Sequence, residues 1–154
     1  MNEEHLNAIS NAVLNVSPQL GIEGVEFAGI GECGKNIDTS GVVCIVGVIG
    51  DLTGNVIFSM SEDCAKWIAS AMMGGMEVME FDELAQSAIS ELSNMLAANS
   101  SMGLSEMGLN TDISTPTMMQ GVFTLSGAYD QCSCIEIKVG EFKFDVYVSL
   151  LPRS

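Results

Sequence analysis

The stretch DELAQSAISELSNML, residues 82–96, predicts a long helix in the middle of the chain. Asp82 is a favourable N-cap residue, and the helical pattern continues to about Met102 or beyond. Mostly apolar side chains recur along it at helical spacing and predict a core-facing stripe. These are Leu84, Ala88, Leu92, Met95 and Asn99. We therefore expect this helix to pack against a sheet.

A polar flank lies beside the predicted core stripe. At about 100° per residue, the side chains that share this flank are Ser87, Glu91, Asn94 and Ala98. Glu91 and Asn94 are surface neighbours, and the small side chains at 87 and 98 leave them open to a docking partner. A glutamate and an asparagine on a helix flank are usually plain solvated surface, so the pattern alone does not decide between surface and site.

Upstream of residue 82 we expect a helix followed by strands. Apolar positions predict a first amphipathic helix over residues 2–16, and Pro18 follows where a helix would have to stop. The expected strands are residues 24–30, 42–49 and 55–60, with a turn-rich stretch at 51–54. The last two of these strands would form a hairpin.

A second helix and a second set of strands follow. Ser61 is a fair N-cap for a helix through Met73, ended by Gly74-Gly75 ahead of a linker at residues 76–81. After Pro116 the chain is β-rich again, with strands expected at 119–125, 132–139 and 142–150.

These elements predict an α+β fold, a mostly antiparallel sheet packed by long helices, in a single domain over residues 1–154. A chain of 154 residues with 47% hydrophobic content has the size of one compact domain. Ala8-Ile9-Ser10 in the first helix matches Ala88-Ile89-Ser90 in the long helix, which is a faint sign of internal duplication.

The charge balance disfavours two classes of partner. Twenty acidic and 5 basic residues give a formal charge of -15, which repels phosphate backbones and anionic lipid. We therefore expect neither nucleic acid nor a membrane as partner. The longest apolar run, residues 41–50, is far shorter than the roughly 20 residues of a membrane-spanning helix, and no signal-peptide pattern is present. A cytoplasmic location is expected.

The cysteines and methionines suggest packing more than chemistry. Five cysteines at irregular spacing favour reduced, mostly buried thiols over a disulfide framework. Cys132 and Cys134 alternate like strand residues, and with His5 as the single histidine no metal-ligand set is completed. Residues 31–36 lack the spacing of a Walker nucleotide-binding motif, so we interpret them as a loop. Five methionines can fill the core or, less favoured, line an adaptable docking surface: Met72, Met73, Met76, Met118 and Met119.

Residues 82–96 strongly resemble the signature of the CheC/CheX/FliY phosphatases, which is an acidic or serine residue, then E-x-x-N, then a distant proline. The matching positions are Ser87, Glu91, Asn94 and Pro116. Residues 95–115 separate the last two, which is 21 residues and one fewer than the spacing associated with the family. Further likeness lies in residues 50–54, 70–75 and 115–117, while Ala97-Ala98 replaces an expected glycine.

The resemblance also predicts the number of sites. Members similar to CheC can carry the motif on two helices, but here Asn11 and Leu14 stand where the long helix has Glu91 and Asn94. One site per chain is therefore expected. That pattern is similar to CheX, whose members form homodimers.

The resemblance implies a phosphatase that dephosphorylates a CheY-like response regulator. Asn94 would orient the attacking water, because a carboxamide can accept one hydrogen bond and donate another. Glu91 would pair with a lysine or arginine of the regulator. Other partner contacts would come from Ser87, Ala98 and Pro116, although Pro116 can equally be a turn residue that enters a strand.

The regulator itself would supply the phospho-aspartate and the Mg²⁺ ion, so we expect no metal and no cofactor of the chain's own. The alternative is a non-catalytic, CheC-like adaptor that binds a response regulator or a flagellar switch component. An intact Glu91 and Asn94 favour the enzyme, and the alanine at 98 and the shorter spacing to Pro116 leave the adaptor open.

Overall fold

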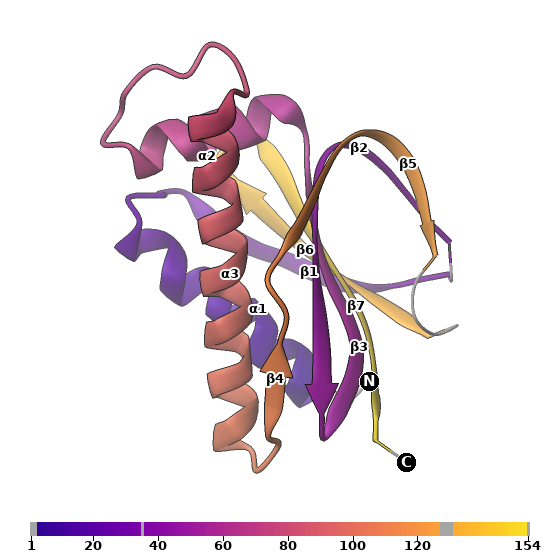
Figure 1. Ribbon diagram of the computed structural model, residues 1–154. Coiled ribbons are helices and arrows are strands. Elements are labelled where there is room, and N and C mark those ends of the chain that lie inside the picture. The colour runs from indigo at the N-terminus through magenta and orange to yellow at the C-terminus, as the bar shows by residue number, and fades with distance from the viewer. Residues whose placement is uncertain (1–2, 35, 127–130, 154) are drawn as a thin grey trace.

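A computed structural model describes residues 3–34, 36–126 and 131–153. Three helices and seven strands follow one another along these residues. They are α1 (Glu3–Gln19), β1 (Val25–Cys33), β2 (Asn36–Gly50), β3 (Leu52–Met60), α2 (Glu62–Met72), α3 (Glu83–Glu106), β4 (Thr111–Ile113), β5 (Thr117–Ser126), β6 (Cys132–Val139) and β7 (Phe142–Pro152). The helices lie on one side of the sheet, while β2 and β5 arch together away from them (Figure 1).

The strands form one antiparallel sheet, which confirms the expected α+β class. Its order is β1-β6-β7-β3-β2-β4, with β5 also paired to β2. The central pair, β3 with β7, joins the first and second halves of the chain. If β1, β2 and β3 are exchanged with β5, β6 and β7 in that order, the pair β1·β6 becomes β2·β5 and the pair β3·β7 is unchanged. The sheet is therefore duplicated, as the faint sequence match of the two long helices indicated.

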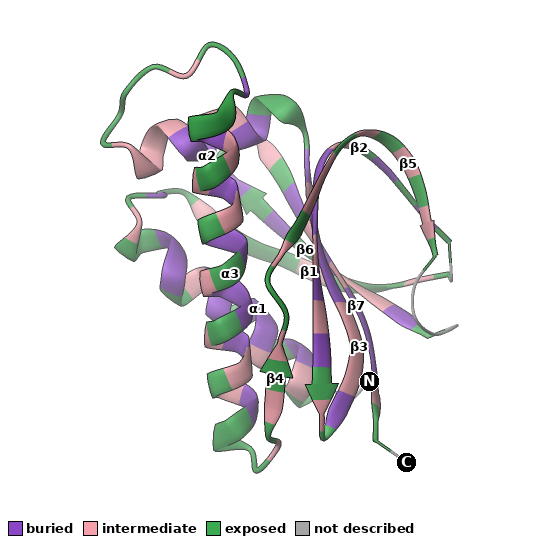
Figure 2. Cartoon of the chain, in the orientation of Figure 1, coloured by how far each residue is buried: buried purple, intermediate pink, exposed green. Residues whose placement is uncertain are grey.

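The main core lies between the helices and the sheet, where the buried residues gather in Figure 2. Ile9 of α1 and Ile89 of α3 are completely buried there. Phe58 of β3 and Phe144 of β7 meet across the central strand pair with ring centroids 6.0 Å apart. Burial of these side chains fixes both long helices on the sheet, since each fully buried Ile or Phe contributes about 1.5–3 kcal/mol.

The helix caps and the first hairpin confirm the sequence interpretation. Ser61 accepts a hydrogen bond from the Cys64 N–H at 3.0 Å, and Asp82 accepts one from the Ala85 N–H at 3.0 Å. β2 and β3 pair as a hairpin, with Val48 opposite Gly54. Gly54 has a φ of 144° and lies against β7, where an added Cβ would collide with the Ser149 carbonyl oxygen.

The first helix does not stop at Pro18. α1 contains Pro18 and ends at Gln19. Proline has a φ that suits a helix, and at this end it removes a single hydrogen bond before the helix terminates. The Ser17 carbonyl then accepts hydrogen bonds from the Leu20 and Ile22 N–H groups, which closes the C-terminus. Asn2, which the expected helix included, lies outside the described residues.

The predicted core stripe of α3 is confirmed in its middle and wrong at its start. Leu92 is buried, and Ala88 and Met95 are half-buried and pack against the core, but Leu84 is 59% exposed. The other buried apolar residues of α3 are Ala85, Ile89, Leu96, Ala97 and Leu104. Small and apolar residues of α3 itself occur on several sides of the helix, so the sequence pattern did not determine which side faces the sheet.

Two strand regions differ from expectation. The expected loop at residues 31–36 is mostly strand, because β1 continues to Cys33 and β2 begins at Asn36; Lys35 lies outside the described residues. The short strand β4 was not expected, and it pairs with β2 next to the end of α3. Three residues are too few to show an alternating pattern in the sequence.

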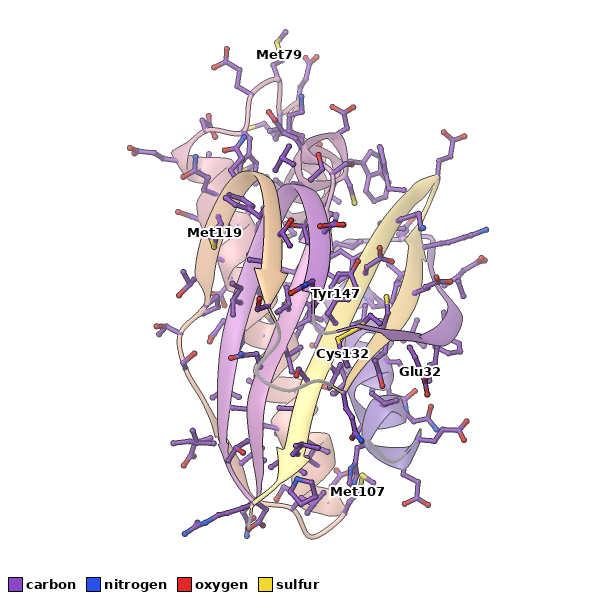
Figure 3. The ribbon with its side chains drawn as sticks, turned by 90° about the vertical axis from the view of Figure 1, so that its right-hand side faces the viewer. Glu32, Met79, Met107, Met119, Cys132 and Tyr147 are labelled. Atoms are coloured by element: carbon purple, nitrogen blue, oxygen red, sulfur yellow. A yellow bond between two sulfur atoms is a disulfide. The ribbon has the colours of Figure 1, made fainter. Side chains whose placement is uncertain are left out.

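The expectation of five reduced thiols is also wrong. The register of β1 and β6 places Cys33 opposite Cys132, and the two form a disulfide (Figure 3). They are separated by 99 residues in sequence, so their spacing carried no sign of pairing. Cys44 and Cys64 are buried free thiols and Cys134 is half-buried, as expected of packing residues.

Three of the five methionines considered for the core are found there. Met72, Met73 and Met118 pack against the core, and Met119 is half-buried. Met76 was expected inside but is 60% exposed.

Across the described residues, no helix is long and apolar enough to cross a bilayer.

Candidate functional site

The polar flank of α3 faces solvent. Ser87, Glu91, Asn94 and Ala98 are all exposed and lie on successive turns of the same side. Leu92 and Ser93, between Glu91 and Asn94, are 2% and 0% exposed. The two candidate side chains, Glu91 and Asn94, therefore project from a helix whose opposite side is packed into the core.

Hydrogen bonds hold this part of α3 in place. The buried hydroxyl of Ser93 donates to the Ile89 carbonyl at 2.9 Å. At the start of the helix, the Gln86 side-chain amide donates to the carbonyl of Phe81 at 3.0 Å, and Phe81 is itself 8% exposed. The first bond satisfies the buried hydroxyl within α3, and the second ties the first turn of the helix to the end of the preceding loop.

A link between α3 and the sheet runs through Ser93 and Cys44. Burial raises the pKa of the Cys44 thiol, and a side-chain hydrogen bond with Ser93 opposes that rise. Cys44 of β2 is paired with Met118 of β5. The same register therefore places Met118 beside the helix turn that carries Glu91 and Asn94.

The polar flank forms one wall of an open groove of about 570 Å³. The residues of α3 that line it are Glu83, Gln86, Ser87, Ser90, Glu91 and Asn94. Met118 lines the groove from β5. The groove thus brings together three of the predicted site residues, Ser87, Glu91 and Asn94.

The other two predicted residues lie outside this groove. Ala98 is exposed one turn beyond Asn94, and Pro116 is half-buried between β4 and β5. Among the described residues, neither lines the groove. Pro116 precedes Met118 by two positions, so it fixes the entry of the strand that forms the second wall.

Hydrogen bonds to β2 hold the segment that contains Pro116. The Gly47 N–H donates to the Ser114 hydroxyl at 2.8 Å, and the Ser114 N–H donates to the Gly47 carbonyl at 2.9 Å. An added Cβ at Gly47 would lie 3.3 Å from the Ser114 hydroxyl oxygen, so this close approach favours glycine. Near the end of α3, the Ser101 hydroxyl donates to the Thr111 carbonyl at 2.9 Å.

The charge of the groove limits what it can bind alone. Its charged lining residues are Glu83 and Glu91, and no lysine or arginine lines it among the described residues. Two carboxylates repel a free phosphate ester. A phosphoryl group can therefore approach only with its own cations, such as a metal ion and the basic side chains of a carrier protein.

The described residues offer no metal site of their own. No group of three or more histidine, cysteine, aspartate and glutamate side chains is placed to hold an ion within residues 3–34, 36–126 and 131–153. The groove instead offers two carboxylates, two carboxamides and two hydroxyl groups. These groups can bind a cation, orient a water molecule and donate hydrogen bonds, but they include no strong nucleophile.

Sequence reasoning missed three groove residues, Glu83, Gln86 and Ser90, and gave Met118 only the less favoured role of a docking-surface residue. Gln86 and Ser90 each immediately precede a predicted site residue, so a wider flank would have included them. Met118 could not be assigned in this way, because its position depends on the pairing of β5 with β2.

Comparisons with known proteins agree on one family. The sequence model of the family described as chemotaxis phosphatase CheX matches residues 42–139. The CheY-P phosphatase CheX of Thermotoga maritima is 38% identical over 110 residues, which are 71% of this chain and 71% of the relative.

Solved structures show the same fold. A CheC-like superfamily protein from Shewanella sp. PV-4 superposes with a TM-score of 0.87 at 19% identity, covering 98% of this chain and 99% of the other. The crystal structure of the CheX–CheY–BeF3–Mg²⁺ complex from Borrelia burgdorferi contains a chain with a TM-score of 0.73 at 22% identity. The similarity there covers 96% of both chains.

Proposed function

This chain belongs to the chemotaxis phosphatase CheX family, and on that premise we propose that it accelerates hydrolysis of the aspartyl phosphate of a CheY-like response regulator. The observation that carries the proposal is the grouping of Ser87, Glu91 and Asn94 in one exposed groove on α3. A related protein in this family is named a CheY-P phosphatase.

Asn94 is the residue that we propose to position the attacking water. An aspartyl phosphate is a mixed anhydride, so its hydrolysis needs an in-line water and stabilisation of charge on the phosphoryl oxygens more than it needs a protein nucleophile. The exposed carboxamide of Asn94 can accept a hydrogen bond from that water and donate another to a phosphoryl oxygen. The water then attacks phosphorus, and the P–O bond to the regulator's carboxylate breaks.

Glu91 is assigned the role of fixing the register of the complex. Its carboxylate is exposed three positions before Asn94, where it can pair with a lysine or arginine of the regulator. Ser87 lies one turn earlier in the same groove and can donate a hydrogen bond to the partner. Ala98 and Pro116 would border the contact, with Pro116 acting through the strand entry that places Met118.

Magnesium belongs to the partner in this proposal. The groove contributes acidic and amide groups, and a phosphorylated regulator brings the phosphoryl group together with its metal ion. The neighbouring complex from Borrelia burgdorferi combines CheX with CheY, BeF3 and Mg²⁺. The catalytic arrangement would thus be complete only after the two proteins associate.

A cytoplasmic location, a homodimer and a single domain over residues 1–154 are parts of the same proposal. Phosphorylated response regulators are cytoplasmic substrates, and β1 is an edge strand with Phe27 and Ile30 exposed at 45% and 38%. A second copy can pair with such an edge. Light scattering measures the oligomer, cell fractionation measures the compartment, and thiol labelling measures whether Cys33 and Cys132 are paired there.

The test measures the decay of a phosphorylated, magnesium-bound regulator with and without the protein, across a panel of regulators from the same cell. We expect the wild type to accelerate decay. Asn94→Ala should abolish the acceleration while binding persists, and Glu91→Ala should weaken binding more than it slows the chemical step. Binding without acceleration by the wild type would contradict catalysis and support the adaptor alternative.

A further inference from the structure

Leu84 is an apolar residue on the same side of α3 as the proposed site. It precedes Ser87 by three positions, and the stripe continues through Glu91, Asn94 and Ala98 at alternating steps of four and three. Leu84 is 59% exposed, although leucine on a long helix is usually buried. At 1.5 Å per residue it lies about 15 Å along the helix from Asn94.

The loop before α3 adds a second exposed apolar side chain. Met79 is 76% exposed and projects at the outer end of the molecule in Figure 3. The buried ring of Phe81 and the hydrogen bond from Gln86 to its carbonyl hold the end of this loop at the start of α3. Four chain steps separate Met79 from Glu83, a span of at most about 14 Å, so Met79 lies near the end of the groove.

The charges around these two residues have a single sign. Residues 74–94 contain five acidic residues and no lysine or arginine. They are Glu77, Glu80, Asp82, Glu83 and Glu91. Glu83 also lines the groove, so this acidic stretch of the chain reaches the groove that holds the proposed catalytic residues.

An interface that starts at Asn94 and extends toward the N-terminal end of α3 can reach both positions. A specific interface covers about 800 Å² on each partner, which corresponds to a patch roughly 30 Å across. Leu84 lies within that reach of Asn94, and Met79 lies toward its far end. Methionine adapts its shape to a partner at low cost, and the exposed side chain of Leu84 supplies further apolar area that a partner can remove from water.

We propose that Leu84 and Met79, bordered by Glu80 and Glu83, form a docking surface that captures the regulator through an apolar patch edged by lysine or arginine. This inference rests on the proposed function. Leu84 and Met79 determine affinity and partner choice, while Asn94 determines the rate of the chemical step. The acidic border steers a basic partner toward the groove.

The experiment compares Leu84→Ser and Met79→Ser with a control of similar exposure, Ile49→Ser. Ile49 is 64% exposed on β2, where it pairs with Asp112 of β4, and it does not line the groove. Dephosphorylation kinetics give KM and kcat, and titration of a regulator activated with beryllium fluoride and Mg²⁺ gives Kd without hydrolysis. We expect each docking variant to raise KM and Kd about 10-fold with kcat within about 2-fold, and the control to match the wild type.

The outcomes separate this inference from the proposed function. Unchanged KM and Kd in both docking variants overturn the docking surface while leaving the phosphatase in place. If the wild type binds regulators without accelerating their decay, a 10-fold loss of binding in Leu84→Ser still supports the docking surface. Absence of binding to every regulator in the panel overturns both. Melting curves that match the wild type exclude a folding defect as the cause of a raised Kd.

Discussion

The helices α1 and α3 are similar on their inner side and different on their outer side. Shifted by 80 positions, most of their buried residues coincide. The matched buried pairs are Ile9 with Ile89, Ala12 with Leu92, Val13 with Ser93, and Val16 with Leu96. On the exposed side, Asn11 of α1 corresponds to Glu91 of α3, and half-buried Leu14 corresponds to exposed Asn94.

The comparison separates the residues that build the fold from those proposed to act. The inner sides keep the same burial because both helices cover the same duplicated sheet. Each outer side borders a groove, and Asn11 lines the one between α1 and α3. Only the α3 groove combines Glu91 with Asn94, so the difference between the halves is chemical rather than architectural.

The largest expected effect concerns the far ends of the strand pairs that join the two halves. Cys33 and Cys132 end β1·β6 with a disulfide, whereas Asn36 and Ser126 end β2·β5 with a hydrogen bond of 3.2 Å. Without reductant, Cys132→Ser should lower the free energy of unfolding by up to about 4.7 kcal/mol, because the bond closes a long loop.

Asn36→Ala is the matched change and should cost about 0.5 kcal/mol or less, since its hydrogen bond is exposed. Urea unfolding without reductant measures both variants. Equal stabilities of Cys132→Ser and Asn36→Ala would contradict the asymmetry between the two ends.

The next prediction tests whether the buried sides of α1 and α3 contribute equally to the core. Ile9→Ala and Ile89→Ala each remove a completely buried side chain from the same core. Each should lower the free energy of unfolding by about 2–5 kcal/mol, and the two losses should be similar. Thermal and urea unfolding provide the values. A near-zero loss in either variant would show that one helix does not share the core.

A smaller effect tests whether the exposed sides of α3 and α1 differ in regulator binding. Glu91→Lys reverses the charge that is proposed to pair with the regulator, so KM for the phosphorylated regulator should rise about 10-fold or more. Asn11→Lys makes the corresponding change on α1 and should leave KM unchanged. The rise should shrink at high salt. Equal KM values for the two variants would remove Glu91 from the interface.

The smallest effect concerns Asp145 of β7, which lies opposite Glu136 of β6. Its buried Oδ1 accepts no hydrogen bond from the described residues. Burial raises the pKa of the Asp145 carboxyl group, Lys143 opposes this rise, and the negative charge of Glu136 adds to it. The pKa of this carboxyl group is therefore higher in the folded protein than in the unfolded chain. The neutral form, which favours folding, is fully present below the unfolded-state pKa and is lost as the pH rises through the folded-state pKa.

Asp145→Asn should therefore stabilise the fold at pH 7, by less than about 1 kcal/mol because the half-buried carboxylate keeps part of its solvation. The gain should shrink as the pH falls toward about 4, the usual range of an aspartate. Melting temperatures of both proteins between these pH values measure it. A constant difference across the range would assign the effect to packing instead of ionisation.

Local signals were sufficient for the caps, the hairpin and the polar flank. Ser61 and Asp82 cap their helices through hydrogen bonds to residues three positions later, which a sequence pattern can reveal. The side shared by Ser87, Glu91 and Asn94 follows from helical spacing alone. For the same reason, the resemblance of this stretch to a phosphatase signature gave a family that the comparisons confirm.

Non-local pairing explains what the sequence did not reveal. The Cys33–Cys132 bond depends on the register of β1 and β6, and the groove wall at Met118 depends on the register of β5 and β2. The exposure of Leu84 depends on which side of α3 meets the sheet, and apolar residues on several sides left that open. None of these facts has a signature at short sequence distance.

The most direct test of the central claim is the single-turnover hydrolysis rate of a phosphorylated, magnesium-bound regulator held fully in complex with the protein. Asn94→Ala should slow this rate about 100-fold or more at unchanged occupancy, because the water loses its positioning group. Asn11→Ala, the matched change on α1, should leave it at the wild-type value. An Asn94→Ala rate equal to that of the wild type would contradict the assignment of the reaction to α3.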